Sequence, residues 1–310
     1  MRMKNYLKIE HLKMYYNTGE GQITAVDDVS FSVAPNETLG LVGESGSGKT
    51  SVAKSIIRLL PDNGEIVDGS IEYRGREVTE MSKKDIRRKL RWKEISMIPQ
   101  SAMNGFDPVY KIGDQIVEVI RSHEPSTSKG DARARARGLF DNLGLDKERI
   151  DDYPHQFSGG MAQRAMIALA LAVNPSVVLA DEPTTALDVI IQDRILKSIS
   201  DLQREYNSAM LLITHDMSVV SETCDRIAVM YGGRVVEKAD SETIIKSPRH
   251  PYTLGLRNAF PDLNSDTRID LNPGNTSRPP RPRRRLSVRS AMSFRRGALL
   301  ARNARTRGVW

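Results

Sequence analysis

The eight residues Gly43 to Thr50, GESGSGKT, decide the fold class of this chain. They follow the apolar run TLGLVG at 38–43, which predicts a buried strand, and they lead into TSVAKSIIRLL at 50–60, whose apolar spacing predicts a helix. A glycine-rich loop with lysine and threonine between a strand and a helix is a phosphate-binding loop. The stretch therefore predicts an α/β protein that binds a phosphate group.

The residue types in this loop indicate how it binds phosphate. Gly43 and Gly48 let backbone N–H groups wrap around a β-phosphate, and the following helix adds its positive end. We expect Lys49 to reach the β- and γ-phosphates and Thr50 to hold Mg²⁺. The alternative is a glycine turn with a surface lysine. The loop alone does not separate molecular switches, kinases and motors.

Patterns elsewhere in the chain extend the α/β prediction. Residues 7–34 alternate apolar and polar side chains and predict antiparallel strands, and 69–78 predicts a hairpin. Residues 112–172 are mostly helical in pattern, and further apolar strands are predicted at 176–180 and 209–214. Strands that alternate with helices predict a parallel sheet, here with an antiparallel patch near the N-terminus and a helical insertion midway.

Two carboxylates follow the predicted strand at 176–180. Asp181 and Glu182 stand in VVLADEP, at a place where P-loop enzymes hold Mg²⁺ with an acid. A second carboxylate directly beyond the first can orient and deprotonate the water that attacks a γ-phosphate. A solvated loop is the alternative for an acidic pair, and the phosphate-binding loop in the same chain favours the functional interpretation.

A second candidate anion site opens a predicted helix at FSGGMAQR, residues 157–164. A serine and two glycines at a helix start can bind an anion. The alternative is an ordinary N-cap formed by Ser158. The presence of one phosphate-binding helix start already in the chain favours the anion site.

Composition and charge limit the class of protein. The chain has 310 residues, 39% hydrophobic and 27% charged, with one cysteine, so an internal disulfide and a multi-cysteine metal site are excluded. The run 165–173 is too short to span a membrane, and the first residues lack the apolar stretch of a secretory signal, which predicts a cytosolic protein. Residues 277–310 hold 11 Arg and no Lys, Asp or Glu, so the net charge of +7 becomes 35 − 39 = −4 for 1–276.

The order of these motifs resembles the nucleotide-binding subunits of ATP-binding cassette (ABC) transporters, and within them the ATPases of oligopeptide and dipeptide importers. The resemblance runs from about Leu7 to Leu263. GESGSGKT is similar to the Walker A motif, VVLADEPTTALD to the Walker B motif and D-loop, and FSGGMAQR to the signature. MIPQ resembles the Q-loop, LLITHDM the switch-histidine motif, and SPRHPYTLGL at 247–256 the segment that follows the ATPase domain in the peptide-importer branch.

The resemblance implies a role for each of these residues. The ATP-binding residues implied are Tyr16, Gly43, Ser45, Gly46, Ser47, Gly48, Lys49, Thr50 and Ser51. The catalytic residues implied are the general base Glu182, the switch histidine His215 and Gln100, while Thr50, Gln100 and Asp181 hold Mg²⁺. Ser158, Gly159 and Gly160 contact ATP held by a partner subunit, and Asp188 belongs to the D-loop. Tyr16 stacks on adenine, or is alternatively a packed strand residue.

The resemblance also implies partners and a domain organisation. A second ATPase subunit, identical or a sister, pairs head to tail with the chain, and two permease subunits and an extracytoplasmic solute-binding protein complete a peptide importer. The chain is then peripheral on the cytoplasmic face of the cell membrane. The domains expected are an ATPase domain at 1–246 with a helical subdomain at about 101–172, an extension at 247–276, and an arginine-rich, disordered tail at 277–310.

Two features depart from the family pattern. Ala162 replaces an arginine that is common in this branch, which predicts weaker contact and coupling at the subunit interface. The tail after about Thr276 lacks the cysteine-bearing stretch of relatives. We interpret it as an altered reading frame, or alternatively as a basic arm on anionic lipid headgroups.

Other functions and substrates are weighed against peptide import. A cassette ATPase acting on nucleic acid needs zinc cysteines, long coiled coils or a second cassette, and the 57 residues between Gln100 and Ser158 leave no room for a coiled coil. No specific nucleic acid is therefore expected. A switch or kinase is disfavoured by the signature and histidine motifs. Nickel and sugar importers share the branch, so the substrate stays open.

Overall fold

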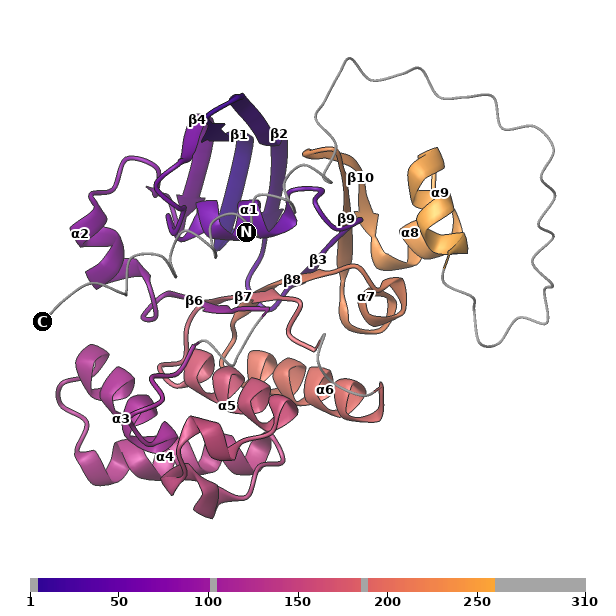
Figure 1. Cartoon of the computed structure of the whole chain (residues 1–310). Helices are drawn as coiled ribbons and strands as arrows, with labels where there is room; N and C mark the ends of the chain where they lie inside the picture. The colour runs from indigo at the N-terminus through magenta and orange to yellow at the C-terminus, as the bar shows by residue number, and fades with distance from the viewer. Residues whose placement is uncertain (1–4, 101–104, 185–188, 260–310) are drawn as a thin grey trace, which may run out of the picture. The chain divides into compact units, whose positions relative to one another are not determined.

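The computed structural model describes residues 5–100, 105–184 and 189–259, all within one compact unit, Met1–Pro261. A four-stranded antiparallel sheet has the order β2-β1-β4-β5, and a six-stranded sheet has the order β10-β9-β3-β8-β7-β6 (Figure 1). The strands are β1 (Leu7–Thr18), β2 (Gly21–Val33), β3 (Thr38–Val42), β4 (Gly64–Tyr73), β5 (Arg76–Glu77), β6 (Ile95–Ile98), β7 (Val177–Asp181), β8 (Ala209–Thr214), β9 (Arg226–Tyr231) and β10 (Arg234–Asp240).

The six-stranded sheet is parallel except at one edge. β3 pairs in parallel with β8 and β9, and β7 pairs in parallel with β6 and β8. Only β10 runs antiparallel, against β9. This is the mixed sheet that the alternation of predicted strands and helices implied, and the antiparallel sheet near the N-terminus is confirmed as well.

Helices cover both faces of the parallel sheet. α1 lies between the two sheets, and α5 and α6 lie on the other face with α3 and α4 beyond them (Figure 1). The helices are α1 (Lys49–Ile56), α2 (Lys83–Asp85), the π-helical turn η1 (Ile86–Leu90), α3 (Ile112–His123), α4 (Lys129–Asn142), the 3₁₀ turns η3 (Lys147–Asp151) and η4 (Pro154–Gln156), α5 (Gly159–Leu171), α6 (Val189–Glu205), α7 (Met217–Thr223), α8 (Ser241–Lys246) and α9 (Pro251–Asn258).

Alternation along the buried strands explains how one sheet serves two cores. In β7, Leu179 packs with α1 and the antiparallel sheet, whereas Val178 and Ala180 pack with the helices of the opposite face. Successive side chains of a strand point to opposite faces, so a strand buried on both sides reads as a continuous apolar run. The run VVLA is such a strand, and all five residues of β7 are buried.

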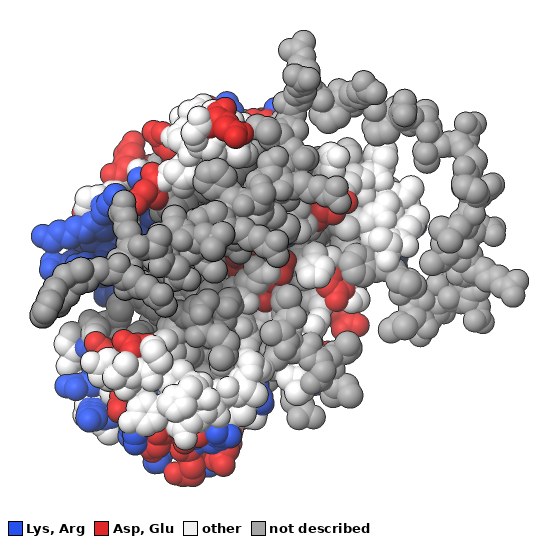
Figure 2. All heavy atoms as spheres, viewed as in Figure 1, with Lys and Arg blue, Asp and Glu red and all other residues white. Residues whose placement is uncertain are grey.

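The described surface carries a local basic cluster. Figure 2 shows Lys and Arg gathered at the left, over α2 and η1 of Figure 1. Its exposed members are Lys83, Lys84, Arg87, Arg88 and Lys89, and Lys89 pairs with Asp85 at 2.7 Å. The net charge of −4 for residues 1–276 therefore conceals a positive surface in this segment.

No helix among the described residues has the length and apolar character needed to cross a membrane. The predicted tail at 277–310 lies outside the described residues.

Candidate functional site

The carboxyl ends of neighbouring parallel strands bring the sequence-predicted residues to one edge of the sheet. The loop Gly43–Thr50 follows β3, Gln100 follows β6 after one proline, Glu182 follows β7, and His215 follows β8. In open α/β sheets, ligands bind outside the carboxyl ends of the strands. The topology alone therefore places these side chains in one site.

The glycines of the loop allow a close approach of backbone that no other residue permits. Gly43 and Gly48 have φ of +152° and +104°, and a Cβ added to either would lie 2.2 Å from a carbonyl oxygen, of Met230 and Ala25 respectively. L-residues with side chains rarely adopt such φ values, and glycine does so without strain. The loop is thus fixed by β9 on one side and β2 on the other.

Lys49 is held inside this loop. Its Nζ donates to the carbonyl oxygens of Gly43 and Glu44 at 2.7 and 2.8 Å, and its side chain is buried. Burial lowers the pKa of Lys49, while the carboxylates of Glu182 and Asp181 oppose that shift. A desolvated ammonium at the start of α1 is suited to hold an anion.

Asp181 is the buried acid of the site. Its Oδ1 accepts a hydrogen bond from the Thr50 hydroxyl at 3.0 Å, and the residue is 2% exposed. Burial raises the pKa of Asp181, the Thr50 hydrogen bond lowers it, and nearby Glu182 raises it further. A carboxylate and a hydroxyl side by side form an oxygen-donor set of the kind that Mg²⁺ prefers.

Glu182 has both carboxylate oxygens held by neighbouring loops. Gln100 Nε2 donates to Oε2 at 2.7 Å, and His215 Nδ1 lies 3.2 Å from Oε1. The backbone N–H of Glu182 donates to the Ile213 carbonyl of β8 at 2.8 Å, and its φ is +49°. A non-glycine residue in this left-handed region is strained, and such strain concentrates at functional sites. The strained backbone aims the Glu182 carboxylate between the Gln100 and His215 loops.

Tyr16 reaches the same site from the antiparallel sheet. Its hydroxyl lies 3.0 Å from Ser51 Oγ, in the first turn of α1, and the ring is half-buried. The structure therefore places the phenol ring beside the start of α1, partly exposed and packed against the core of the antiparallel sheet. Its stacking on adenine stays a prediction.

The signature residues stand apart from this cluster. Ser158 caps α5 by accepting from the Met161 N–H at 3.4 Å, and Ser158 and Gly159 are exposed, with nothing within 4 Å of a Cβ built on Gly159. Among the described residues, no hydrogen bond joins this helix start to the loop at 43–50. Ala162 is 3% exposed and packs into the helical core, so its methyl group faces inward. Asp188 lies outside the described residues.

Two contacts at the site were not predicted from the sequence. Buried Gln163 of α5 donates to the Pro99 carbonyl at 3.5 Å, which ties the signature helix to the segment carrying Gln100. The Tyr252 hydroxyl of α9 accepts from the Glu44 N–H at 3.0 Å. Gln163 belongs to the signature stretch and Tyr252 to the HPYT segment, so both residues stand in motifs that the sequence shows. Neither motif indicates which residue the side chain contacts.

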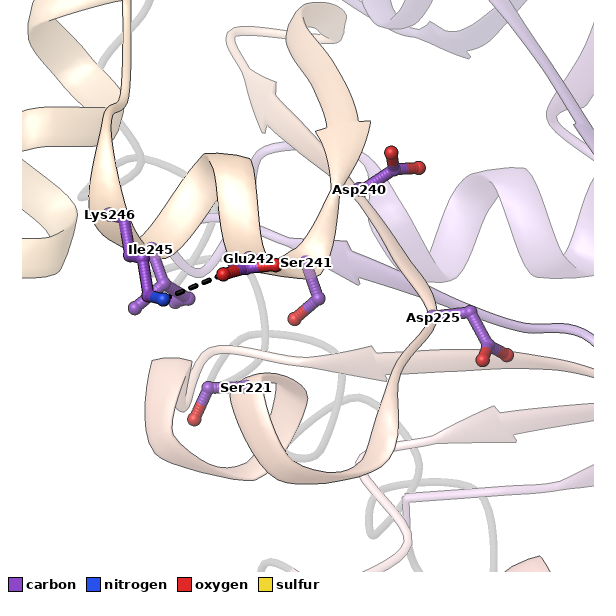
Figure 3. A pocket seen from close by; sticks show the side chains of 7 residues that line it. All are labelled: Ser221, Asp225, Asp240, Ser241, Glu242, Ile245 and Lys246. Carbon is purple, nitrogen blue, oxygen red and sulfur yellow. Dashed lines mark hydrogen bonds and ion pairs between the residues drawn. The ribbon is translucent and has the colours of Figure 1, made fainter.

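A separate surface pocket of about 520 Å³ lies away from this cluster (Figure 3). Asp225, Asp240 and the ion-paired Glu242 and Lys246 line it. Asp225 accepts from the N–H of Thr38, the first residue of β3, so the pocket belongs to the opposite edge of the sheet. The phosphate-binding loop does not line it.

Comparison with known proteins gives this geometry a family. Residues 26–185 match the family described as ABC transporter, and residues 236–285 match the oligopeptide/dipeptide transporter C-terminal region. The oligopeptide transport ATP-binding protein OppD of Escherichia coli is 42% identical over 272 residues, covering 87% of this chain and 80% of that protein. The chain belongs to the ATP-binding subunits of ABC transporters.

Other relatives agree with this family. The dipeptide transport ATP-binding protein DppD of Lactococcus lactis is 43% identical over 267 residues, covering 86% of this chain and 76% of that protein. A solved dimeric structure of the cassette MJ0796, bound to ADP and Pi after hydrolysis, superposes with a TM-score of 0.69 at 26% identity and covers 76% of this chain and 98% of that one. The fold, the family and the nucleotide-binding ATPase function predicted from the sequence are confirmed.

The C-terminal match also bears on the tail. It ends at residue 285, beyond the Thr276 boundary that the sequence suggested. The likeness to the family thus continues into the first part of the arginine-rich segment, whose structure lies outside the described residues.

Proposed function

We propose that this ABC ATPase powers the import of oligopeptides or dipeptides through separate permease subunits. The observation that carries the proposal is the hydrogen-bonded cluster at the strand ends, in which the phosphate-binding loop, Asp181 and Glu182 meet. The peptide substrate is supported by the names of the relatives and by the match to the oligopeptide/dipeptide transporter C-terminal region.

The loop binds the triphosphate of ATP in this proposal. The backbone N–H groups of Ser45 to Thr50 and the start of α1 surround the β-phosphate, and Lys49 reaches the β- and γ-phosphates. Tyr16 stacks on adenine beside Ser51. Binding the anion offsets the desolvation cost of burying the Lys49 ammonium, because the ammonium then gains a partner of opposite charge.

Mg²⁺ fits the oxygen donors beneath the loop. Thr50 and Asp181 would hold the ion, and the side-chain amide oxygen of Gln100 would be a further ligand. When bound, the ion neutralises charge that develops on the phosphate oxygens. The raised pKa of Asp181 is consistent with a buried carboxylate that gains from a nearby cation.

Glu182 acts as general base in this proposal. Its carboxylate takes a proton from water as the water oxygen bonds to the γ-phosphorus and the bond to the β–γ bridging oxygen breaks, giving ADP and phosphate. Gln100 and His215 hold the two carboxylate oxygens and so orient the base. Both are exposed and can turn toward the substrate.

Pairing with a second ATPase subunit completes the site in this proposal. Ser158, Gly159 and Gly160 form a helix start, exposed at its first two residues, that suits a γ-phosphate held by the partner. Asp188, outside the described residues, belongs to the D-loop in this proposal. The partner is a sister subunit or a second copy. Two permeases and an extracytoplasmic binding protein complete the importer, with this chain peripheral on the cytoplasmic face of the membrane. The domains proposed are the ATPase domain at 1–246, with its helical subdomain at about 101–172, and the extension at 247–276. Closure of the ATPase dimer reaches the permeases through the surface around Gln100 and the helical subdomain.

Reconstitution in vesicles tests the substrate. The full chain, its permeases and its binding protein are placed in liposomes, and ATP hydrolysis is measured with a peptide library, Ni²⁺ or oligosaccharides outside. Peptide import predicts stimulation by peptides and not by the other two. Stimulation by Ni²⁺ or sugar alone contradicts the peptide assignment and leaves the ATPase assignment in place.

A further inference from the structure

A hydrogen bond joins the phosphate-binding loop to α9, far along the chain. The backbone N–H of Glu44 donates to the Tyr252 hydroxyl at 3.0 Å across 208 positions of sequence. Glu44 is the second residue of the loop, and Tyr252 stands in the first turn of α9 within the segment that matches the transporter C-terminal region. The C-terminal segment therefore contacts the loop at its entry.

The Glu44 peptide groups are held from two sides. The N–H donates to Tyr252, and the Glu44 carbonyl oxygen accepts from Lys49 Nζ at 2.8 Å. A rotation of this residue moves the carbonyl that holds the ammonium. The Tyr252 hydroxyl thereby acts on the position of Lys49 through a single intervening residue.

Tyr252 is itself fixed by its surroundings. Its ring lies 4.5 Å from that of Tyr231 at 42°, and its N–H donates to His250 Nδ1 at 3.2 Å. The N–H groups of Arg249 and His250 donate to the Glu237 carboxylate of β10 at 2.7 and 3.0 Å. The start of α9 is thus anchored on β10, and the phenol has little freedom to leave the loop.

The strand beside α9 supports the same side of the loop. The Met230 carbonyl at the end of β9 leaves no room for a Cβ at Gly43, and the Gly233 N–H donates to the Ser47 carbonyl at 3.1 Å. The turn between β9 and β10 and the start of α9 form one wall behind the loop. The Tyr252 bond uses the Glu44 N–H, which precedes the N–H groups of residues 45–50, so it takes none of them from a ligand.

We propose that Tyr252 is a positioning residue for ATP binding, which fixes the entry of the phosphate-binding loop from the C-terminal segment. The proposal rests on the proposed binding of ATP by this loop. The hydroxyl orients Glu44 and, through its carbonyl, Lys49, without touching the nucleotide. ATP affinity is then set in part by the HPYT segment, which carries no phosphate-binding group of its own in this arrangement.

The test compares two Tyr→Phe variants of the full chain. Tyr252→Phe removes the hydroxyl that holds Glu44 and keeps the ring on Tyr231, whereas Tyr231→Phe removes a hydroxyl that has no hydrogen-bond partner among the described residues. Equilibrium binding of Mg-ATP and steady-state hydrolysis are measured. Tyr252→Phe is expected to raise the Kd and KM for ATP about fivefold, the factor of one neutral hydrogen bond, with kcat within about twofold. Tyr231→Phe is expected to match the wild type.

Three results overturn the inference. Equal ATP affinity of Tyr252→Phe and the wild type removes the positioning role and leaves ATP binding by the loop intact. An equal loss in both variants assigns the effect to the ring pair. No ATP binding by the wild-type chain removes the proposed function together with the inference.

A second measurement remains informative if Tyr252→Phe folds poorly. Amide hydrogen exchange of Glu44 in the wild-type chain is expected to be slow, because its N–H donates a hydrogen bond to Tyr252. The exchange rate is expected to be comparable to that of the amides in α1. Exchange at the rate of an unprotected loop amide contradicts the hydrogen bond on which the inference depends.

Discussion

Two helix starts in this ABC ATPase carry residues that the sequence predicts to bind anions, and they differ in how much the chain surrounds them. The start of α1 is enclosed: Lys49 is buried, Gly43 and Gly48 touch neighbouring backbone, and Asp181 lies beneath Thr50. The start of α5 is open, with Ser158 and Gly159 exposed. This difference is what we expect of a site shared between two subunits, in which one chain builds the binding half and presents the other half outward.

The largest expected effect concerns the chemistry between these two halves. Glu182→Gln keeps both helix starts and removes the base, so kcat for ATP hydrolysis is expected to fall by about 10²- to 10⁴-fold while ATP still binds. Glu222→Gln, at an exposed position of α7, is the matched control and is expected to leave the rate unchanged. Steady-state phosphate release measures both. Hydrolysis within twofold of wild type in Glu182→Gln removes the base assignment.

The second-largest expected effect tests whether Ser158, at the open start of α5, does more than cap the helix. Ser158 caps α5 and Ser128 caps α4 in the same way, each accepting from the N–H three residues on. Changing either to Ala is expected to destabilise the fold by about 1 kcal/mol. Only Ser158→Ala is expected to lower ATP hydrolysis, by about 10- to 100-fold, because it alone loses a bond to a charged phosphate.

Thermal unfolding and hydrolysis are measured on the two serine variants together. Equal activity of Ser158→Ala and Ser128→Ala contradicts a role of the α5 start beyond capping.

A smaller expected effect concerns ATP affinity at the enclosed start of α1, beside which Tyr16 lies. Tyr16→Ala is expected to weaken ATP binding about 3- to 10-fold through loss of ring stacking, even in dilute chain, because Tyr16 belongs to the same polypeptide as the loop. Tyr15 points to the other face of β1, so Tyr15→Ala is expected to keep the affinity. Equilibrium binding of ATP decides the matter, and an unchanged affinity in Tyr16→Ala makes it a packed strand residue.

The smallest expected effect is on the stability of the fold, which the buried Asp181 carboxylate at the enclosed site lowers. Burial raises the pKa of Asp181 above its usual 3.8, so the charged carboxylate destabilises the fold once the pH exceeds the unfolded value. Without nucleotide and Mg²⁺, Asp181→Asn is expected to raise Tm by about 2–4 °C at pH 7. The gain is expected to shrink as the pH falls through the raised pKa toward 3.8, because the wild-type Asp181 carboxyl then becomes neutral in the folded state, as Asn is at every pH. A lower Tm for Asp181→Asn at pH 7 contradicts this account.

The enclosed side of the comparison is also the part that the sequence predicts well. Glycine spacing, the flanking strand and helix, and the DE pair are local patterns, so the places of Lys49, Asp181 and Glu182 follow from them. The strands β6, β9 and β10 were not predicted, because short or mixed runs gain their pairing from tertiary neighbours. The Tyr252 contact joins segments far apart in sequence, which no local pattern specifies.

Ala162 shows what a sequence motif does not specify. The arginine that is common at this position suggested an interface contact that Ala162 weakens. The Ala162 side chain packs into the helical core, and weaker coupling stays a prediction. A motif defines which residues lie near a site, whereas the helix face decides which of them point at it.

The measurement that tests the shared site most directly is the rate of ATP hydrolysis per chain over a hundredfold range of concentration. It is made with the chain alone and with its sister ATPase subunit added. A shared site predicts that the rate per chain rises with the concentration of one of these two proteins, and that Ser158→Ala makes the rise about 10- to 100-fold smaller. A rate per chain that is constant in both series, down to the lowest concentration, contradicts it.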